Sequence, residues 1–403
     1  MNGATLIMIA VVVVSLALSH QVRPLNILTY SLVAALVFAR LWSLFSVRAI
    51  SVRRQIREFR VQAGQSIEER ITVHNSLLIP RLWLQIIDHA NLPGHGASRV
   101  IDLAPGGTRS WVVRTPCPRR GEYCLGPTTL AGADPLGLFK TQRDYRGTQR
   151  ILVYPKTVEL PAFSVPTANL LGGQRRRTGF QQTTPQASEV REYAPGDPLN
   201  RIHWPTTARA GRLMVKEFDT DPTADVWIYL DLERGVHVGE GDESTEEYGV
   251  TIAASLAKLF FQQNRNVGLV ASCGLPVILP ADRGDRQYLK MLESLAVVHA
   301  DGSMPLANLL AAEGFRSGGH STALVITPSL DDAWVGALRQ MRYSGVRAAV
   351  IELEAITFGG SESSLLHVSA AAAADLPLYL VKRGDALEQA LLTDVRRLAV
   401  PRR

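Results

Sequence analysis

The sequence predicts a multi-domain membrane protein: a transmembrane helical hairpin, an antiparallel β-sandwich-like domain, and an α/β domain with a mostly parallel sheet. Three observations predict this order. Two apolar stretches open the chain, short runs of alternating apolar and polar residues follow, and strands then alternate with helices to the end. With 403 residues, 46% of them hydrophobic and 20% charged, the chain is long enough for several folded domains.

Residues 1–46 are predicted to cross the membrane twice. Residues 1–22 contain no charged side chain and residues 25–45 contain only Arg40, so each stretch approaches the roughly 20 residues that span a bilayer. The short link around Pro24 favours a tight hairpin. Because five arginines follow between Arg48 and Arg60, the positive-inside rule predicts that both termini and the bulk of the chain are cytoplasmic. A signal peptide that ends near Ser19 is the alternative, although it would lack a basic start.

Residues 47–155 are predicted to form the β-sandwich-like domain. Residues 66–73 and 110–114 alternate between apolar and polar side chains, and Gly and Pro turns divide such runs. The three cysteines of the chain show no spacing typical of metal ligands, and their odd number fits a reducing compartment. We therefore expect no disulfide framework here.

Residues 156–223 are predicted to be a connector. Its first part, residues 156–184, loses the apolar pattern, whereas residues 189–218 hold the densest mixture of charges, aromatic residues and turn formers in the chain. A turn is predicted at residues 195–198 because Gly196 tolerates a positive φ. The candidate site residues of this segment are Arg191, Glu192, Tyr193, Gly196, Asp197, Arg201, His203, Trp204, Arg209 and Glu217.

Three interpretations of these candidate residues remain open. The favoured one is a buried or half-buried salt-bridge network, formed around Trp204 by Arg191, Asp197, Arg201 and Arg209. The second is a surface that docks a partner, and the third is catalysis that uses His203 as an acid or base. Since the sequence has no nucleophile elbow, phosphate-binding loop or paired-histidine zinc motif, we predict no catalytic residue, no enzyme activity and no cofactor.

Residues 224–403 are predicted to form the α/β domain. Val226–Leu232 reads as a buried strand, and Ser244 with Glu247 forms a capping box that begins a helix. Further strands are predicted at residues 267–271, 323–327, 346–353 and 378–381, with helices between them. Alternation of this kind predicts a mostly parallel sheet that is covered by helices.

This half resembles the von Willebrand factor A fold, whose metal site uses Asp-x-Ser-x-Ser after the first strand and a later Thr-Asp. Asp231 matches the first position, but Glu233 and Gly235 replace the serines and Pro328 follows Thr327. Because a divalent ion needs several converging oxygen ligands, the set Asp231, Glu233 and Thr327 is a degenerate site. We expect no tightly bound metal.

The segment from Glu189 to Phe218 resembles the signature of the bacterial family catalogued as domain of unknown function 58. The matching positions are Arg191, Glu192, Tyr193, Gly196, Asp197, Ile202, Trp204, Ala208, Arg209, Gly211, Leu213, Val215, Glu217 and Phe218. The resemblance extends upstream through Arg120–Tyr123 and Asp134–Phe139.

The resemblance implies a membrane-anchored adaptor or scaffold in the bacterial inner membrane. Such a protein works with a MoxR-type AAA+ ATPase and binds partners through its α/β domain and the motif. A cell-envelope hydrolase or transferase that uses the motif residues is the alternative. The net charge of +6 is better explained by membrane topology than by nucleic acid, since aromatic residues make up only 7% of the chain. The sequence leaves the oligomeric state open.

Overall fold

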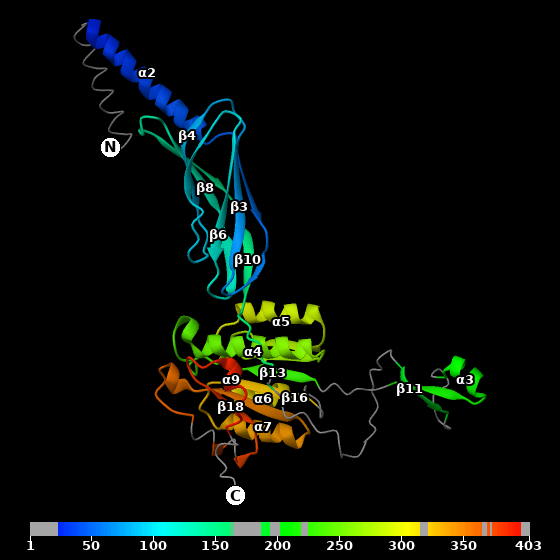
Figure 1. The fold of residues 1–403 in the computed structure, drawn as a ribbon. Coiled ribbons are helices and arrows are strands. Elements are labelled where there is room, and N and C mark those ends of the chain that lie inside the picture. Colours follow the sequence, from blue (N-terminus) through cyan, green and yellow to red (C-terminus); the bar gives the residue numbers. More distant parts are fainter. Residues whose placement is uncertain are drawn as a thin grey trace. The chain divides into compact units, whose positions relative to one another are not determined.

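The computed structural model describes residues 23–161, 163, 187–193, 202–218, 225–314, 321–364, 369–370 and 373–395. They belong to two compact units, which are described separately (Figure 1). The N-terminal unit holds residues 1–159, 238–258 and 286–301, and the C-terminal unit holds residues 160–237, 259–285 and 302–403. The predicted boundaries at residues 46, 155 and 223 remain predictions.

Helix α2 (Arg23–Ser46) is the one helix among the described residues that is long and apolar enough to cross a membrane. Large apolar side chains stand exposed along it, among them Ile27, Leu28, Val37 and Phe38. Lipid would remove this surface from water. Helix α2 is the second of the two predicted spans. The first, residues 1–22, lies outside the described residues, so the structure shows one candidate span and not a hairpin.

Ten strands follow α2 in the N-terminal unit and form the predicted β-rich domain, residues 50–154, which we call the β-domain. The strands are β1 (Ile50–Ile56), β2 (Arg60–Gln62), β3 (Ser66–Asn75), β4 (Arg81–Asp88), β5 (Arg99–Leu103), β6 (Thr108–Pro116), β7 (Gly121–Leu125), β8 (Thr128–Ala133), β9 (Lys140–Tyr145) and β10 (Gln149–Tyr154). They form sheets of order β1-β3-β6, β5-β4-β8-β9 and β2-β10-β7. All of these pairs are antiparallel except β2 with β10.

The core of the β-domain follows from the alternation of strand β3. Ile67, Ile71 and Val73 are buried, whereas the residues between them are more exposed. Because side chains alternate between the two faces of a strand, Glu69 must share the buried face with these apolar residues. The buried charge that results is described below.

The C-terminal unit is built on the predicted parallel sheet. Its strands are β13 (Val226–Leu230), β14 (Val267–Ala271), β15 (Val277–Asp282), β16 (Thr322–Thr327), β17 (Arg347–Leu353) and β18 (Leu378–Val381), in the order β15-β14-β13-β16-β17-β18. Every neighbouring pair is parallel except β14 with β15. The sequence predicted β14 and β18 to the residue, and it missed β15, because that antiparallel edge strand follows β14 too closely for a helical crossover.

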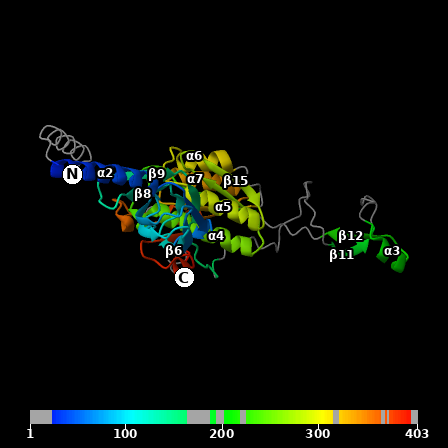
Figure 2. The ribbon, with the colours of Figure 1, turned by 90° about the horizontal axis from the view of Figure 1, so that it is seen from above.

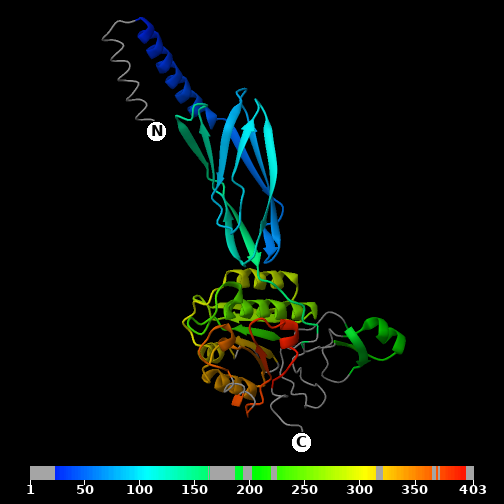
Figure 3. The ribbon, with the colours of Figure 1, turned by 60° about the vertical axis from the view of Figure 1, so that its left-hand side comes forward.

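The longer helices after residue 240 are α4 (Thr245–Gln262), α5 (Asp285–Val297), α6 (Leu306–Glu313) and α7 (Ala333–Tyr343). Short elements are the four-residue helix α9 (Leu387–Ala390) and the 3₁₀ turns at Gly241–Glu243 and Ala355–Phe358. The predicted cap of α4 is present, since the Glu247 amide donates to Ser244 Oγ at 3.2 Å. Helices α6 and α7, golden and orange in Figure 3, share one apolar core with the sheet. Leu309, Trp334 and Leu338 of the helices belong to this core together with Trp227 and Tyr229 of β13.

Candidate functional site

The motif segment folds as a strand hairpin with a short helix between its strands. Strand β11 (Ala187–Glu192) pairs antiparallel with β12 (Met214–Phe218), and helix α3 (Trp204–Ala210) lies between them in the chain (Figure 2). The Tyr193 amide continues the pairing by donating to Leu213 O at 2.9 Å. We call this element the motif hairpin. The sequence analysis placed these residues in the connector that carries the motif and predicted neither the strands nor the helix.

The motif hairpin holds seven of the ten candidate residues. Gly196, Asp197 and Arg201 lie outside the described residues. Arg191 is paired in β11 and Glu217 in β12. Glu192 is exposed and its Oε2 lies 3.2 Å from Arg212 Nη1, which is a surface ion pair of little energetic consequence.

His203 fixes the start of α3. Its amide donates to Met214 O at 2.7 Å, and its ring Nδ1 lies 2.6 Å from Thr206 Oγ1. Gly211 ends the helix in the left-handed conformation, at φ 66°, where a Cβ would be strained. His203 therefore has a local structural role in joining α3 to β12.

Trp204 is exposed, whereas the favoured interpretation had placed it inside a buried or half-buried network. Trp204 is the first residue of α3 and is 65% exposed. Arg209, near the end of the same helix, is also exposed. A two-stranded hairpin with a seven-residue helix has too little apolar surface to enclose an indole. Trp204 therefore faces solvent, whereas the salt-bridge network remains a prediction, because Asp197 and Arg201 lie outside the described residues.

Asp231 lies at the carboxyl end of β13, where the degenerate metal site was predicted. Its carboxylate is fully buried and accepts three hydrogen bonds: from Thr327 Oγ1 at 2.7 Å, from the Glu233 amide at 3.1 Å and from Ser272 Oγ at 3.3 Å. The structure thus brings Asp231 and Thr327 together. Because these donors come from the ends of β13, β14 and β16, the carboxylate ties three neighbouring strands together.

The sequence analysis did not predict Ser272 as a site residue. Ser272 follows β14 directly, so its position at the carboxyl end of a strand is like that of Asp231 and Thr327. Ser272 Oγ also accepts the Leu232 amide at 2.8 Å, so it links the two chain segments that leave the sheet. Burial, together with the carboxylates of Asp231 and Asp331, raises the pKa of Glu233.

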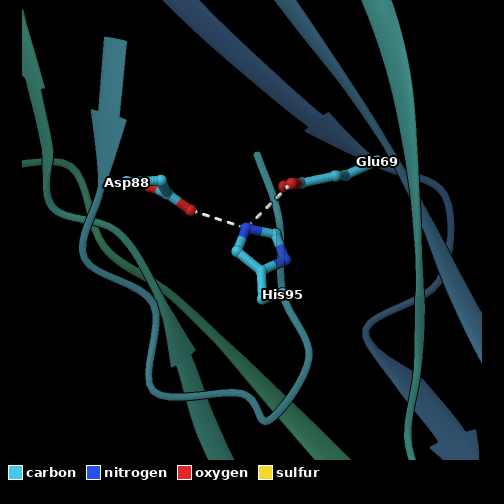
Figure 4. A group of neighbouring side chains, drawn as sticks. All are labelled: Glu69, Asp88 and His95. Atoms are coloured by element: carbon cyan, nitrogen blue, oxygen red, sulfur yellow. Dashed lines mark hydrogen bonds and ion pairs between the residues drawn. The ribbon is translucent and has the colours of Figure 1, made fainter. Parts of the chain in front are cut away.

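A second cluster, in the β-domain, was not predicted at all. Glu69 on β3, Asp88 at the end of β4 and His95 in the following loop converge, and none of the three side chains is more than 3% exposed (Figure 4). His95 Nε2 lies 2.6 Å from Asp88 Oδ2 and 3.3 Å from Glu69 Oε1. Their donor atoms are close enough to surround a metal ion, and this is the one such group among the described residues.

Arg54 on β1 already supplies a cation to this cluster. Its Nη2 pairs with Asp88 Oδ1, and its Nε lies 3.4 Å from Glu69 Oε2. With Arg54, the two carboxylates need only one proton to reach neutrality, whereas a divalent ion would leave a buried excess of positive charge. We therefore interpret Arg54, Glu69, Asp88 and His95 as a buried charge cluster that joins strands β1, β3 and β4.

The two carboxyl groups of the charge cluster respond to it in opposite directions. Burial raises the pKa of Glu69 above its ordinary value of 4.5, and the nearby positive charges of Arg54 and His95 only partly offset this. Burial also acts on Asp88, but the His95 hydrogen bond and the Arg54 charge outweigh it and lower the pKa of Asp88 below 3.8. Asp88 is the anion of the cluster, and Glu69 is the group that retains a proton more readily.

Replacing Glu69 with glutamine is expected to remove a pH dependence of the β-domain. Because the folded state raises the pKa of Glu69, its stabilising contribution is full below about pH 4.5 and is lost as the pH rises through the folded pKa. Asp88 acts in the opposite sense, since its contribution is lost as the pH falls below 3.8. Urea unfolding at pH values from about 2 to 8 measures both.

Glu68→Gln is the matched control, because the Glu68 side chain is 38% exposed on the same strand. We expect Glu69→Gln to gain stability relative to the parent as the pH rises, and Glu68→Gln to follow the parent. A parallel pH profile for parent and Glu69→Gln would contradict the assignment of the raised pKa.

Comparison with known proteins shows a match over the motif hairpin and much of the α/β domain. Residues 189–357 match the family described as "Protein of unknown function DUF58". The uncharacterized protein YeaD of Bacillus subtilis is 24% identical over 322 residues, which cover 76% of this chain and 77% of YeaD. The uncharacterized protein Rv1480 of Mycobacterium tuberculosis is 27% identical over 116 residues, which cover 28% of this chain and 36% of Rv1480. Neither name states an activity.

Two solved structures are similar to parts of this chain at low scores. The CARDB domain of a Pyrococcus furiosus protein has a TM-score of 0.22 at 13% identity, and the match covers 26% of this chain and 94% of that domain. The pilus adhesin SpaC of Lactobacillus rhamnosus GG has a TM-score of 0.33 at 11% identity, and the match covers 42% of this chain and 29% of the adhesin. Both scores are too low to identify a shared fold.

Proposed function

This chain belongs to the DUF58 family, and we propose that it is a membrane-anchored adaptor that works with a MoxR-type AAA+ ATPase. In this proposal residues 1–22 and α2 form a hairpin in the bacterial inner membrane, and the bulk of the chain is cytoplasmic. The exposed apolar surface of α2 supports the anchor. The arginines that follow α2 support the orientation.

We assign the α/β domain of the adaptor a von Willebrand factor A-like role in which recognition does not depend on a metal. The hydrogen bonds from Thr327, Ser272 and the Glu233 amide support this role. They hold the Asp231 carboxylate in the interior and leave it as a structural group. Partner recognition then depends on side chains that reach the surface.

The exposure of Trp204 is the observation that carries the proposal. A tryptophan that is 65% exposed leaves a large apolar area in water, and tryptophan is the residue type most enriched among the energetic centres of protein interfaces. Arg209 on the same helix is exposed as well. The motif hairpin therefore offers the aromatic and guanidinium groups that a protein partner can bury.

Trp204→Ala is expected to abolish co-purification of the ATPase without unfolding the chain. The experiment is affinity purification of the full chain from detergent-solubilised membranes, with the bound proteins identified by mass spectrometry. Because Trp204 is exposed, the melting temperature of the variant should equal that of the parent. Tyr343→Ala is the matched control, since Tyr343 is an aromatic residue that is 85% exposed at the end of α7.

Two outcomes would count against the adaptor proposal. Full retention of the ATPase by Trp204→Ala would show that the motif hairpin is not the docking surface. Absence of any AAA+ ATPase from the parent purification, with the chain folded and in the membrane fraction, would remove the proposed partner.

A further inference from the structure

The β-domain exposes apolar side chains at one end, where α2 enters it. We call this set the apolar rim: Leu78, Ile79, Leu82, Trp83 and Leu136. Leu78 is 87% exposed, Leu136 62% and Trp83 57%. Soluble domains seldom leave this many large apolar side chains together in water. The two segments that supply them are the β3–β4 connection with the start of β4, and the β8–β9 loop.

Contacts with the end of α2 fix the place of the β3–β4 connection. The Ser76 amide donates to Ala49 O at 2.9 Å, and Arg81 Nη2 donates to Arg48 O at 3.2 Å. Ala49 and Arg48 follow directly on α2, which ends at Ser46. Leu78 and Ile79 lie in the chain between Ser76 and Arg81, so they are held near the C-terminal end of α2.

The β8–β9 side of the apolar rim is attached to α2 itself. Ser43 Oγ lies 2.7 Å from Thr141 Oγ1, and a Cβ at Gly132 would lie only 2.2 Å from Ser46 Oγ. Only glycine allows β8 to approach the helix this closely. Figure 1 shows the lower end of α2 against the same end of the β-domain.

The backbone of β4 is strained in a way that exposes two apolar residues. The pairing of β4 with β5 shifts between Arg81 and Leu84, and Trp83 has φ 50°. In a regular strand one of two consecutive side chains would point inward, but here both Leu82 and Trp83 face solvent. A positive φ at an aromatic residue is a costly conformation that is kept where it has a use.

Asp134 builds the β8–β9 loop that carries Leu136. Asp134 is buried, and its carboxylate accepts the Leu136 amide at 2.9 Å and the Phe139 amide at 2.6 Å. Gly137 has φ 68° in the turn, which favours glycine. These bonds hold the loop closed and leave Leu136 at its tip. The conformation of Asp134–Phe139 thus leaves an apolar side chain in solvent.

We propose that the apolar rim inserts into the interfacial layer of the bilayer that α2 crosses, so that the β-domain lies on the membrane as well as being tethered to it. This inference rests on the anchoring part of the proposed function. Continuity with α2 identifies lipid as the occupant, because hydrocarbon already surrounds the neighbouring helix. The composition agrees, since Trp83 is the aromatic type enriched at bilayer interfaces. The exposed Arg40 on α2 and Arg48 just after it suit lipid phosphates.

The test uses the full chain in vesicles of phosphatidylethanolamine and phosphatidylglycerol, with Cys124→Ser as background because Cys117 and Cys273 are buried. A nitroxide is attached to Leu78→Cys or Leu136→Cys, and its collisions with oxygen and with a water-soluble nickel chelate are measured. Phe38→Cys on α2 is the reference for hydrocarbon. Phe59→Cys, an exposed apolar position between β1 and β2, is the reference for water.

We expect the labels at positions 78 and 136 to favour oxygen over the chelate several times more than the label at position 59. If both behave like position 59 while position 38 lies in hydrocarbon, the membrane contact is overturned and the anchor stands. If position 38 also behaves like position 59, the anchor itself fails and the contact fails with it. Low collision rates with both reagents at positions 78 and 136 would show a protein partner there, which also overturns the lipid assignment.

Discussion

Replacing Arg54 with methionine is expected to lower the stability of the β-domain by about 3 to 5 kcal/mol, the usual cost of leaving a buried ion without its partner. Arg54 is the guanidinium that faces both Asp88 and Glu69, and the two carboxylates are at most 1% exposed. Methionine keeps the apolar stem and removes the charge. The Asp88 carboxylate would then be left with His95 and with the neutral hydroxyl of Thr128, which donates to Oδ1 at 3.1 Å.

Hydrogen exchange of the amides in β1, β3 and β4 measures this loss locally. A change of 3 kcal/mol or more should speed exchange through the open state roughly a hundredfold, since each 1.4 kcal/mol is a factor of ten. Arg53→Met is the matched control, because Arg53 is exposed on the same strand. Unchanged exchange in Arg54→Met would show that the charge cluster does not hold the strands together.

Asp231→Ala is expected to destabilise the C-terminal unit by about 3 kcal/mol or more. The change leaves the hydroxyl groups of Thr327 and Ser272 and the Glu233 amide without their acceptor, and each buried polar group left unpaired costs about 1 to 3 kcal/mol. Exchange of the amides at the ends of β13, β14 and β16 gives the measurement. Asp282→Ala is the control, since Asp282 is an exposed carboxylate at the end of β15 in the same sheet.

The parent chain should gain no stability from Mg²⁺ or Mn²⁺ at this site, because ligand binding to the folded state would raise its melting temperature. The hydroxyl and amide donors already occupy both oxygens of Asp231. A saturable rise in melting temperature that Asp231→Ala abolishes would show that the altered set still binds a metal.

Much of the architecture could be predicted because it depends on local patterns. The apolar run of α2, the alternation in β3 and the continuous apolar run of β14 are each visible in consecutive residues of the sequence. The placement of Asp231 and Thr327 at neighbouring strand ends also followed from the sequence, since parallel strands align their carboxyl ends. Family membership was readable for a similar reason, because residues 189–218 are contiguous.

The charge cluster and the apolar rim could not be read in this way, because their members lie far apart in the chain. Arg54, Glu69, Asp88 and His95 come from three strands and a loop, and only the pairing of β1 with β3 and the closing of the loop after β4 bring them within hydrogen-bond distance. The alternation of apolar and polar residues in β3 places Glu69 on the buried face. The sequence does not reveal which side chains compensate the charge of its carboxylate.

By itself the sequence determined the apolar helix near the start, the β-rich and α/β halves and the family resemblance, since each depends on residues close together in the chain. Only the tertiary structure decided that Trp204 is exposed and that Leu136 and Trp83 stand at the same end of the β-domain as α2. Exposure is a property of what packs against a side chain. For these residues, exposure depends on whether segments distant in the sequence pack against them.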